Sequence, residues 1–114
     1  LTATGADPRE VASWSKALDR APADFPTIVA TKSLIGHALG AAGALESVAA
    51  LLMMEGGFAH PSLNCEDVHP EIAAYEPAIP HELLKMPELR TVIKAGFGFG
   101  DVNACLVFRK WDSF

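Results

Sequence analysis

Apolar residues recur with a helical period near the start of the chain. Asp7-Pro8-Arg9-Glu10 has the form of a helix start, with Asp as N-cap, Pro in the first position and Glu three residues after the cap. The positions that follow place apolar side chains on one helical face: Val11, Trp14, Ala17 and Leu18. We therefore predict an amphipathic helix that ends near Arg20, before two prolines.

Three short apolar runs have the composition of strands. Thr27–Thr31 is β-branched and mostly apolar, which is typical of a buried parallel strand. Thr91–Ala95 and Ala104–Phe108 flank the Gly-rich segment Gly96–Gly100, so we expect them to pair antiparallel around a loop. Cys105 would then be a core thiol.

The longest apolar segment predicts a helix from about Gly40 to Glu55, closed by Gly56-Gly57. It is apolar nearly all round, so we expect it to lie inside a protein larger than this segment could enclose. Its length of about 25 Å at ~1.5 Å per residue, and its polar middle, argue against membrane insertion. Glu46 is the anomaly: a buried carboxylate needs a partner such as Lys32, unless this turn faces solvent.

The proline-rich stretch from His60 to Arg90 shows little periodicity and is expected to connect the other elements, with one or two short turns of helix or strand. His60, His69 and His81 are interpreted as surface-loop residues.

The composition and net charge of the chain favour some classes of protein and argue against others. The chain has 114 residues, half of them apolar, and a net charge of −5 with scattered lysines and arginines. This favours a globular α/β domain of ordinary size and argues against nucleic acid as a partner. Two cysteines, without metal-ligand spacing, predict a reduced cytoplasmic location and no metal site.

The segment Lys32–Gly43 carries the candidate chemistry. Lys32 and His37 are five residues apart, just before the N-terminus of the apolar helix. The glycines around them would allow a substrate or another backbone segment to come close. A nearby cation, the helix dipole and desolvation all oppose protonation of such a histidine, which would then donate a hydrogen bond to a developing oxyanion. A purely structural histidine remains the alternative. A phosphate cradle is disfavoured, because Lys32 precedes the glycines.

Separate motifs, in the same order, resemble the C-terminal part of the β-ketoacyl-acyl carrier protein synthases. These are Lys32–His37 followed by Gly40–Gly43 and Glu46, then Gly96–Gly100 with Asn103, and the opening Thr2-Ala3-Thr4. Met53–Phe58 and Pro61–Asn64 also match. The resemblance spans nearly the whole chain and implies an α/β thiolase-like fold, with residues 1–114 as the C-terminal portion of a ketosynthase domain.

The resemblance also implies roles. His37 would be a catalytic histidine that stabilises the enolate left by malonyl decarboxylation. Lys32 would order the histidines, and Glu46 would lie in the polar network beside it. Phe99 would supply an oxyanion-hole N–H and gate the acyl pocket, with Phe97 and Gly98 lining the substrate site. Thr2 and Thr4 would bind the phosphopantetheine arm of acyl carrier protein. No bound cofactor and a homodimer are implied.

The chain departs from the family pattern at several points, among them Leu1, which stands where the family motif has Gly. The nucleophilic cysteine belongs to an N-terminal half that this chain lacks, so we expect the segment alone to be inactive. Asp101-Val102 replaces the usual Gly-Thr after Gly100. A non-catalytic partner subunit that shapes chain length is therefore an alternative. A thiolase is disfavoured because its C-terminal cysteine loop is replaced by Phe97 and Phe99.

Overall fold

The computed structural model describes residues 6–111, which fall into two compact units. Unit 1 comprises 6–36 and 59–84, and unit 2 comprises 37–58 and 85–111. Each unit is a body in its own right and is considered separately below.

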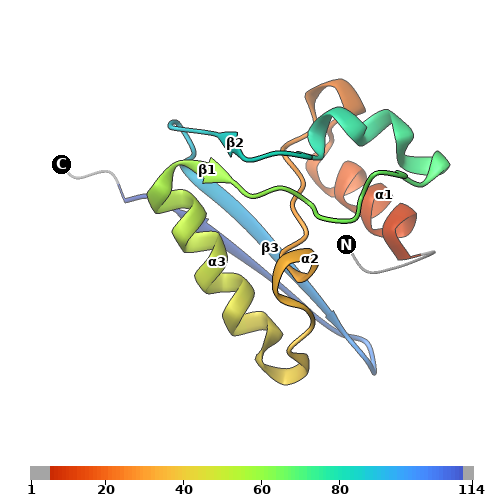
Figure 1. The fold of residues 1–114 in the computed structure, drawn as a ribbon. Coiled ribbons are helices and arrows are strands. Elements are labelled where there is room, and N and C mark those ends of the chain that lie inside the picture. The colour runs from red at the N-terminus through yellow and green to blue at the C-terminus, as the bar shows by residue number, and fades with distance from the viewer. Residues whose placement is uncertain (1–5, 112–114) are drawn as a thin grey trace. The chain divides into compact units, whose positions relative to one another are not determined.

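Unit 1 is built from helical elements around a small apolar core. Helix α1 (Ala6–Leu18) confirms the predicted amphipathic helix and buries Val11, although Asp7 lies inside its first turn instead of capping it. The 3-10 helices η1 (Pro22–Asp24) and η3 (Pro70–Ala78) pack on each other, and η3 also packs on α1 (Figure 1). The rings of Phe25 and Tyr75 meet edge to face at 4.9 Å, which adds a specific contact to this core.

The predicted strand Thr27–Thr31 does not form within the described residues. This stretch makes one backbone bond to η3, from the Ile28 N–H to the Ala78 carbonyl at 2.8 Å. A parallel strand requires a hydrogen-bonded neighbour along its length, and a single bond does not make a ladder. The prediction of a buried parallel strand is therefore wrong for the described residues, and Thr31 at its end has helical backbone angles.

Unit 2 consists of one long helix on a β-hairpin. The 3-10 turn η2 (Leu39–Ala41) leads into helix α3 (Ala42–Gly56), which ends at Gly57 in the left-handed conformation, as predicted. Strands β3 (Thr91–Gly98) and β4 (Val102–Arg109) pair antiparallel, with Thr91 opposite Arg109 and Gly98 opposite Val102. The hairpin confirms the two predicted strands, and α3 packs on β3 (Figure 1).

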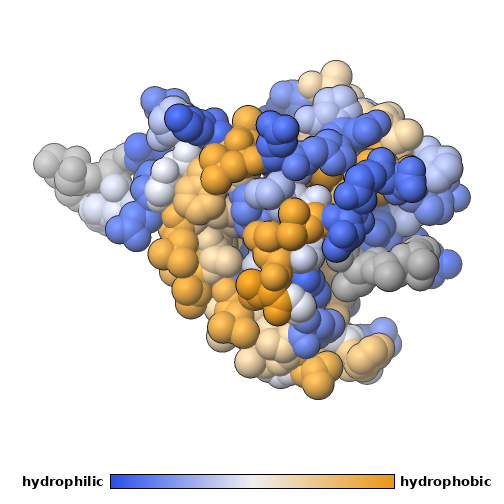
Figure 2. Space-filling model, viewed as in Figure 1, coloured by the Kyte–Doolittle hydropathy of each residue, from blue (hydrophilic) through white to orange (hydrophobic). Residues whose placement is uncertain are grey.

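Helix α3 has a covered face and an open one. Its buried residues are Glu46, Ala50, Met53 and Met54. The opposite side exposes a row of aliphatic side chains, which forms an apolar surface over α3 in Figure 2: Leu45, Val48, Leu51 and Leu52. Leu39–Gly56 is also long and apolar enough to cross a membrane by length and composition, a test that the core helices of soluble proteins pass as well.

Two further expectations are corrected. The Gly-rich segment 96–100 is not a loop throughout, because β3 continues to Gly98 and the turn begins at Phe99. Cys105 is exposed, as is every residue of β4 except the partly buried Phe108, so it is not a core thiol among the described residues. The connecting region 58–90 contains the two-residue strands β1 (Phe58–Ala59) and β2 (Leu84–Lys85), which pair with each other, and η3.

Candidate functional site

Lys32 is the first residue of a single helical turn in unit 1. Its two neighbours in the sequence each form a hydrogen bond to a residue of segment 60–63. Helix α2 (Lys32–Ile35) ends at Gly36, whose φ of 73° is a conformation that favours glycine. The Thr31 hydroxyl lies 3.3 Å from Nε2 of His60. On the other side of Lys32, the Leu63 N–H donates to the Ser33 hydroxyl oxygen at 3.1 Å. Segment 60–63 therefore fixes the backbone that carries Lys32.

His60 is buried, with 7% of its surface exposed, so its interpretation as a surface-loop residue is wrong. Its Nδ1 lies 2.9 Å from the Pro61 carbonyl oxygen, which can only accept, so Nδ1 carries the proton. Nε2 is then an acceptor for the Thr31 hydroxyl. The ring is satisfied at both nitrogens, which explains why it tolerates burial. His69 and His81 are exposed, as expected.

His37 lies in unit 2, two residues before Leu39, where η2 begins. The backbone N–H of Leu39 donates to its Nδ1 at 3.0 Å. Since Nδ1 accepts this bond, the ring proton of the neutral form resides on Nε2. The side chain is exposed in this chain. The geometry therefore presents Nε2–H as a hydrogen-bond donor, which is what the predicted oxyanion role requires.

Glu46 lies on the face of α3 that covers the hairpin. Its Oε2 is 3.1 Å from Nζ of Lys94 on β3, and the two side chains are 10% and 13% exposed. The carboxylate that the sequence marked as anomalous is thus buried and ion-paired, but with a lysine that the sequence analysis missed. Lys32 belongs to the other unit, so its pairing with Glu46 stays a prediction.

Lys94 could have been found from the sequence. It is a single charge in an otherwise apolar strand segment, just as Glu46 is a single charge in the first half of an apolar helix. Two opposite charges, each anomalous in its own element, predict a buried pair because each would be costly without the other.

The end of β3 and the turn that follows it, together called the aromatic turn here, present two aromatic rings. Phe97 and Phe99 are both exposed, and Phe99 is completely so. Gly98 opposite Val102 closes the hairpin, which leaves a three-residue loop with φ of 81° at Gly100 and 60° at Asp101. Aspartate tolerates the left-handed region better than most residues, so the turn keeps a shape that glycine adopts freely.

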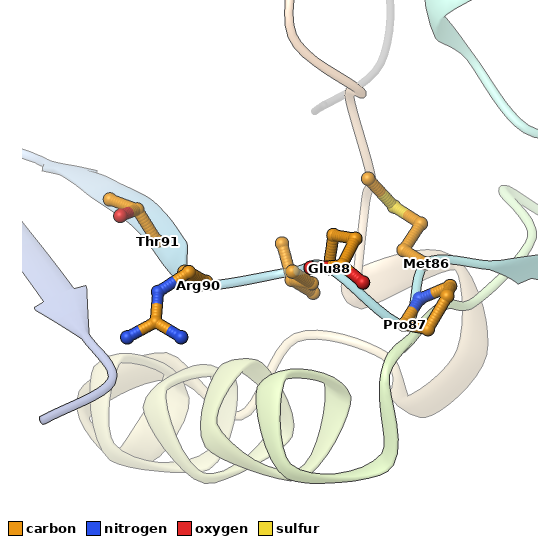
Figure 3. Close-up of a pocket in the computed structure, with 6 residues that line it drawn as sticks. Met86, Pro87, Glu88, Arg90 and Thr91 are labelled. Carbon is orange, nitrogen blue, oxygen red and sulfur yellow. The ribbon is translucent and has the colours of Figure 1, made fainter. Parts of the chain in front are cut away.

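The pockets of the two units do not coincide with these residues. An open depression of about 470 Å³ in unit 2 is lined by the continuous segment from Met86 to Thr91, which leads into β3 and includes its first residue (Figure 3). A depression of about 730 Å³ in unit 1 is lined by the start of α1, by η3 and by the segment that precedes η3 in the sequence, and its lining includes Asp7 and Cys65. Burial, followed by the Asp7 and Glu66 carboxylates, raises the pKa of the Cys65 thiol. Neither of the two depressions is lined by a predicted site residue.

No group of three or more His, Cys, Asp or Glu side chains within residues 6–111 is placed to hold a metal ion. The expectation that the protein has no metal site stays a prediction.

Unit 2 therefore holds His37, Glu46 and the turn with Phe97, Gly98 and Phe99, whereas unit 1 holds Lys32. Thr2 and Thr4 lie outside the described residues.

Comparison with known proteins agrees with the resemblance read from the sequence. Residues 2–66 match the family "Beta-ketoacyl synthase, C-terminal domain". That family implies a thiolase-like fold, with which the mixture of helices and strands is compatible. The chain is 47% identical over 85 residues to 3-oxoacyl-[acyl-carrier-protein] synthase 1 of Escherichia coli K12, covering 75% of the chain and 20% of that protein.

Further relatives extend the match. Haemophilus influenzae 3-oxoacyl-[acyl-carrier-protein] synthase 1 is 42% identical over 88 residues, 77% of the chain and 21% of that protein. The chloroplastic synthase I of Arabidopsis thaliana is 43% identical over 81 residues, 71% of the chain and 16% of that protein. The chain thus spans about a fifth of the length of the curated relatives it matches.

Proposed function

This chain belongs to the β-ketoacyl synthase C-terminal domain family, and we propose that it forms part of a 3-oxoacyl-acyl carrier protein synthase of fatty-acid synthesis. The reaction is a decarboxylative Claisen condensation. A malonyl thioester loses CO2, and the resulting enolate carbon attacks an acyl thioester on a cysteine of the upstream half. The cysteine thiolate leaves as the new carbon–carbon bond forms. The names of the relatives support the assignment; the matched segments cover about a fifth of those longer proteins.

The observation that carries the proposal is the hydrogen bond at His37. Because the Leu39 N–H occupies Nδ1, the neutral ring has its proton on Nε2. A neutral donor at that position stabilises the oxygen of the developing enolate as CO2 leaves, and it cannot itself transfer an excess proton to the enolate carbon. His37 is therefore proposed as the donor to the malonyl thioester oxygen.

The remaining predicted residues complete the proposal. The Phe99 N–H would donate to the oxygen of the acyl thioester, and its exposed ring, with Phe97 and Gly98, would face the acyl chain. The charges of Lys32 and Glu46 would determine the electrostatic field around His37. Thr2 and Thr4 would bind the phosphopantetheine arm, so acyl carrier protein is the proposed carrier of both substrates. A cytoplasmic homodimer without a bound cofactor belongs to the same proposal.

The alternative of a non-catalytic partner subunit rested on Asp101-Val102. The φ of 60° at Asp101 weakens this argument, because the turn retains a left-handed residue where the family has glycine. The residue at the nucleophile position of the upstream half discriminates between the two functions directly, since a partner subunit has no cysteine there.

The test uses the full-length protein with malonyl and acyl thioesters of acyl carrier protein. Loss of one preorganised oxyanion donor costs about 10²–10³-fold in kcat, so His37→Ala is expected to reduce CO2 release by that factor. His81→Ala, an exposed histidine of unit 1, is the matched control and should leave the rate unchanged. Equal rates of CO2 release in His37→Ala and the unmodified protein would disprove the role of His37.

The segment on its own is proposed to be inactive. Its α3 exposes Leu45, Val48 and Leu52 to solvent (Figure 2), a surface that requires another layer of protein to cover it. Residues 1–114 produced alone should show no condensation and no cooperative thermal transition. Turnover by the isolated segment would contradict this.

A further inference from the structure

A buried ion pair connects the helix and the hairpin of unit 2. Nζ of Lys94 on β3 lies 3.1 Å from Oε2 of Glu46 on α3, and only about a tenth of each side chain is exposed. At this distance the pair is a charge-assisted hydrogen bond with a defined direction. The carboxylate and the ammonium therefore fix the position of α3 relative to β3 at this point.

Two glycines lie beside the ammonium. A Cβ at Gly96 of β3 would lie 3.4 Å from Nζ of Lys94, and a Cβ at Gly43 of α3 would lie 3.9 Å from it. Gly43 precedes Glu46 by one turn, so the ammonium lies against the same face of α3 that carries the carboxylate. Lys94, Gly43 and Gly96 thus form a site on the covered face of the hairpin that accommodates this side chain.

Both elements joined by the pair lead to candidate site residues. The segment before α3 carries His37, held by the Leu39 N–H, and Glu46 lies near the first turns of that helix. On the other side, β3 continues past Lys94 and Gly96 to Phe97 and into the turn at Phe99. The Glu46–Lys94 pair is a polar link between the part of unit 2 that holds His37 and the part that holds the aromatic turn.

We propose that Lys94 is a positioning residue, which through Glu46 sets the placement of His37 relative to the Phe97–Phe99 turn. The inference rests on the proposed ketosynthase function. Lys94 touches no substrate. Its ammonium holds the Glu46 carboxylate in one orientation against β3, so that the oxyanion donors on the two elements keep a fixed separation. Catalytic groups lose rate steeply when they are displaced by about 1 Å, so loss of the pair should affect turnover more than binding.

The experiment compares three lysine variants of the full-length protein by the kinetics of malonyl decarboxylation. Lys94→Met keeps the length of the side chain but removes its charge, and it is expected to lower kcat by about 10- to 100-fold while KM changes little. Lys94→Arg restores the charge and should recover most of kcat. Lys85→Met removes an exposed lysine from β2 and serves as the matched control, with unchanged kinetics.

A fourth variant tests the space around the ammonium. Gly96→Ala adds a methyl group about 3.4 Å from Nζ, so it should lower kcat in the same direction as Lys94→Met, by less. Thermal unfolding of every variant, and rates taken well below each transition, separate positioning from folding.

The outcomes are distinct. An unmodified protein that releases no CO2 from the malonyl thioester would overturn the proposed function, and this inference with it. An active protein whose Lys94→Met variant, fully folded, keeps its kcat would overturn the inference alone. A loss of rate that merely parallels the loss of folded protein, in both Lys94→Met and Lys94→Arg, would also overturn it, because the pair would then act only on stability.

Discussion

The two units hold their candidate site residues by different kinds of polar interaction. In unit 1, the backbone around Lys32 is fixed by neutral hydrogen bonds, from Thr31 to His60 and from Leu63 to Ser33. In unit 2, the helix that follows His37 is tied to the hairpin by the charged pair of Glu46 and Lys94. Each arrangement joins a candidate segment to an element distant in sequence, but the energetic consequences differ.

The difference lies in what remains when one partner is removed. A neutral donor or acceptor left without its partner costs about 1–3 kcal/mol when it is buried. An ion left without its counter-ion in the same setting costs about 3–5 kcal/mol, although the intact pair adds little net stability relative to apolar residues. We therefore expect the free energy of unfolding to fall strongly when one member of the ion pair in unit 2 is replaced, and little when both are replaced. Replacing one member of a hydrogen bond in unit 1 should lower it by a smaller amount.

The largest effect is expected at the ion pair. Lys94→Met should lower the free energy of unfolding by about 3–5 kcal/mol, because the Glu46 carboxylate loses the ammonium beside it. The double variant Lys94→Met with Glu46→Gln removes both charges and should recover most of that loss. Urea unfolding of the single and double variants of the full-length protein measures the coupling. Additive effects would show that the two side chains do not interact.

A smaller effect is expected at His60. His60→Ala removes the acceptor of the Thr31 hydroxyl and opens a space in unit 1, so the free energy of unfolding should fall by about 1–3 kcal/mol. His60→Gln, which can still accept from Thr31, should lose less. His81→Ala, an exposed control whose Nε2 lies 3.9 Å from Oε1 of Glu76, should change stability little. Equal stability of His60→Ala and His81→Ala would contradict the buried role of His60.

The exposed ion pair of unit 1 should contribute least among the charged interactions. Arg20 pairs with Asp24 while both side chains are more than half exposed to solvent. Such pairs contribute about 0–1 kcal/mol, so Arg20→Ala should shift the urea midpoint only slightly, and less at high salt. A loss comparable to that of Lys94→Met would invalidate the contrast between buried and exposed pairs.

The smallest effect concerns pH. Burial and neighbouring carboxylates raise the pKa of the Cys65 thiol above its ordinary value. Between the unfolded and the folded pKa the native state holds a proton that the unfolded state has lost, so stability declines as the pH rises through that window. The alkylation rate of Cys65 should keep rising at a pH where a free thiol has levelled off. A rate profile that matches a free thiol would disprove the shift.

Local elements were largely predictable from the sequence. The amphipathic helix, the apolar helix ended by Gly57 and the antiparallel pair were found because each depends on periodicity or on a glycine with positive φ. The segment Thr27–Thr31 was predicted wrongly as a strand because strand formation depends on a neighbour that periodicity does not reveal.

The candidate site was predictable only in part. The sequence located His37 and the aromatic turn and identified Glu46 as a charge in need of a partner. It did not locate Lys94, which is 48 positions further along the chain than Glu46, nor the burial of His60, which follows from bonds to Thr31 and Pro61.

By itself the sequence determined the family, the order of the motifs and the residue types available for oxyanion chemistry, because these depend on neighbours along the chain. The tertiary structure decided which groups meet. It paired Glu46 with Lys94, assigned the proton of His37 to Nε2 through the Leu39 N–H and enclosed His60. Hydrogen bonds and ion pairs act over a few ångströms in space, so only the folded backbone determines which side chains come within that reach.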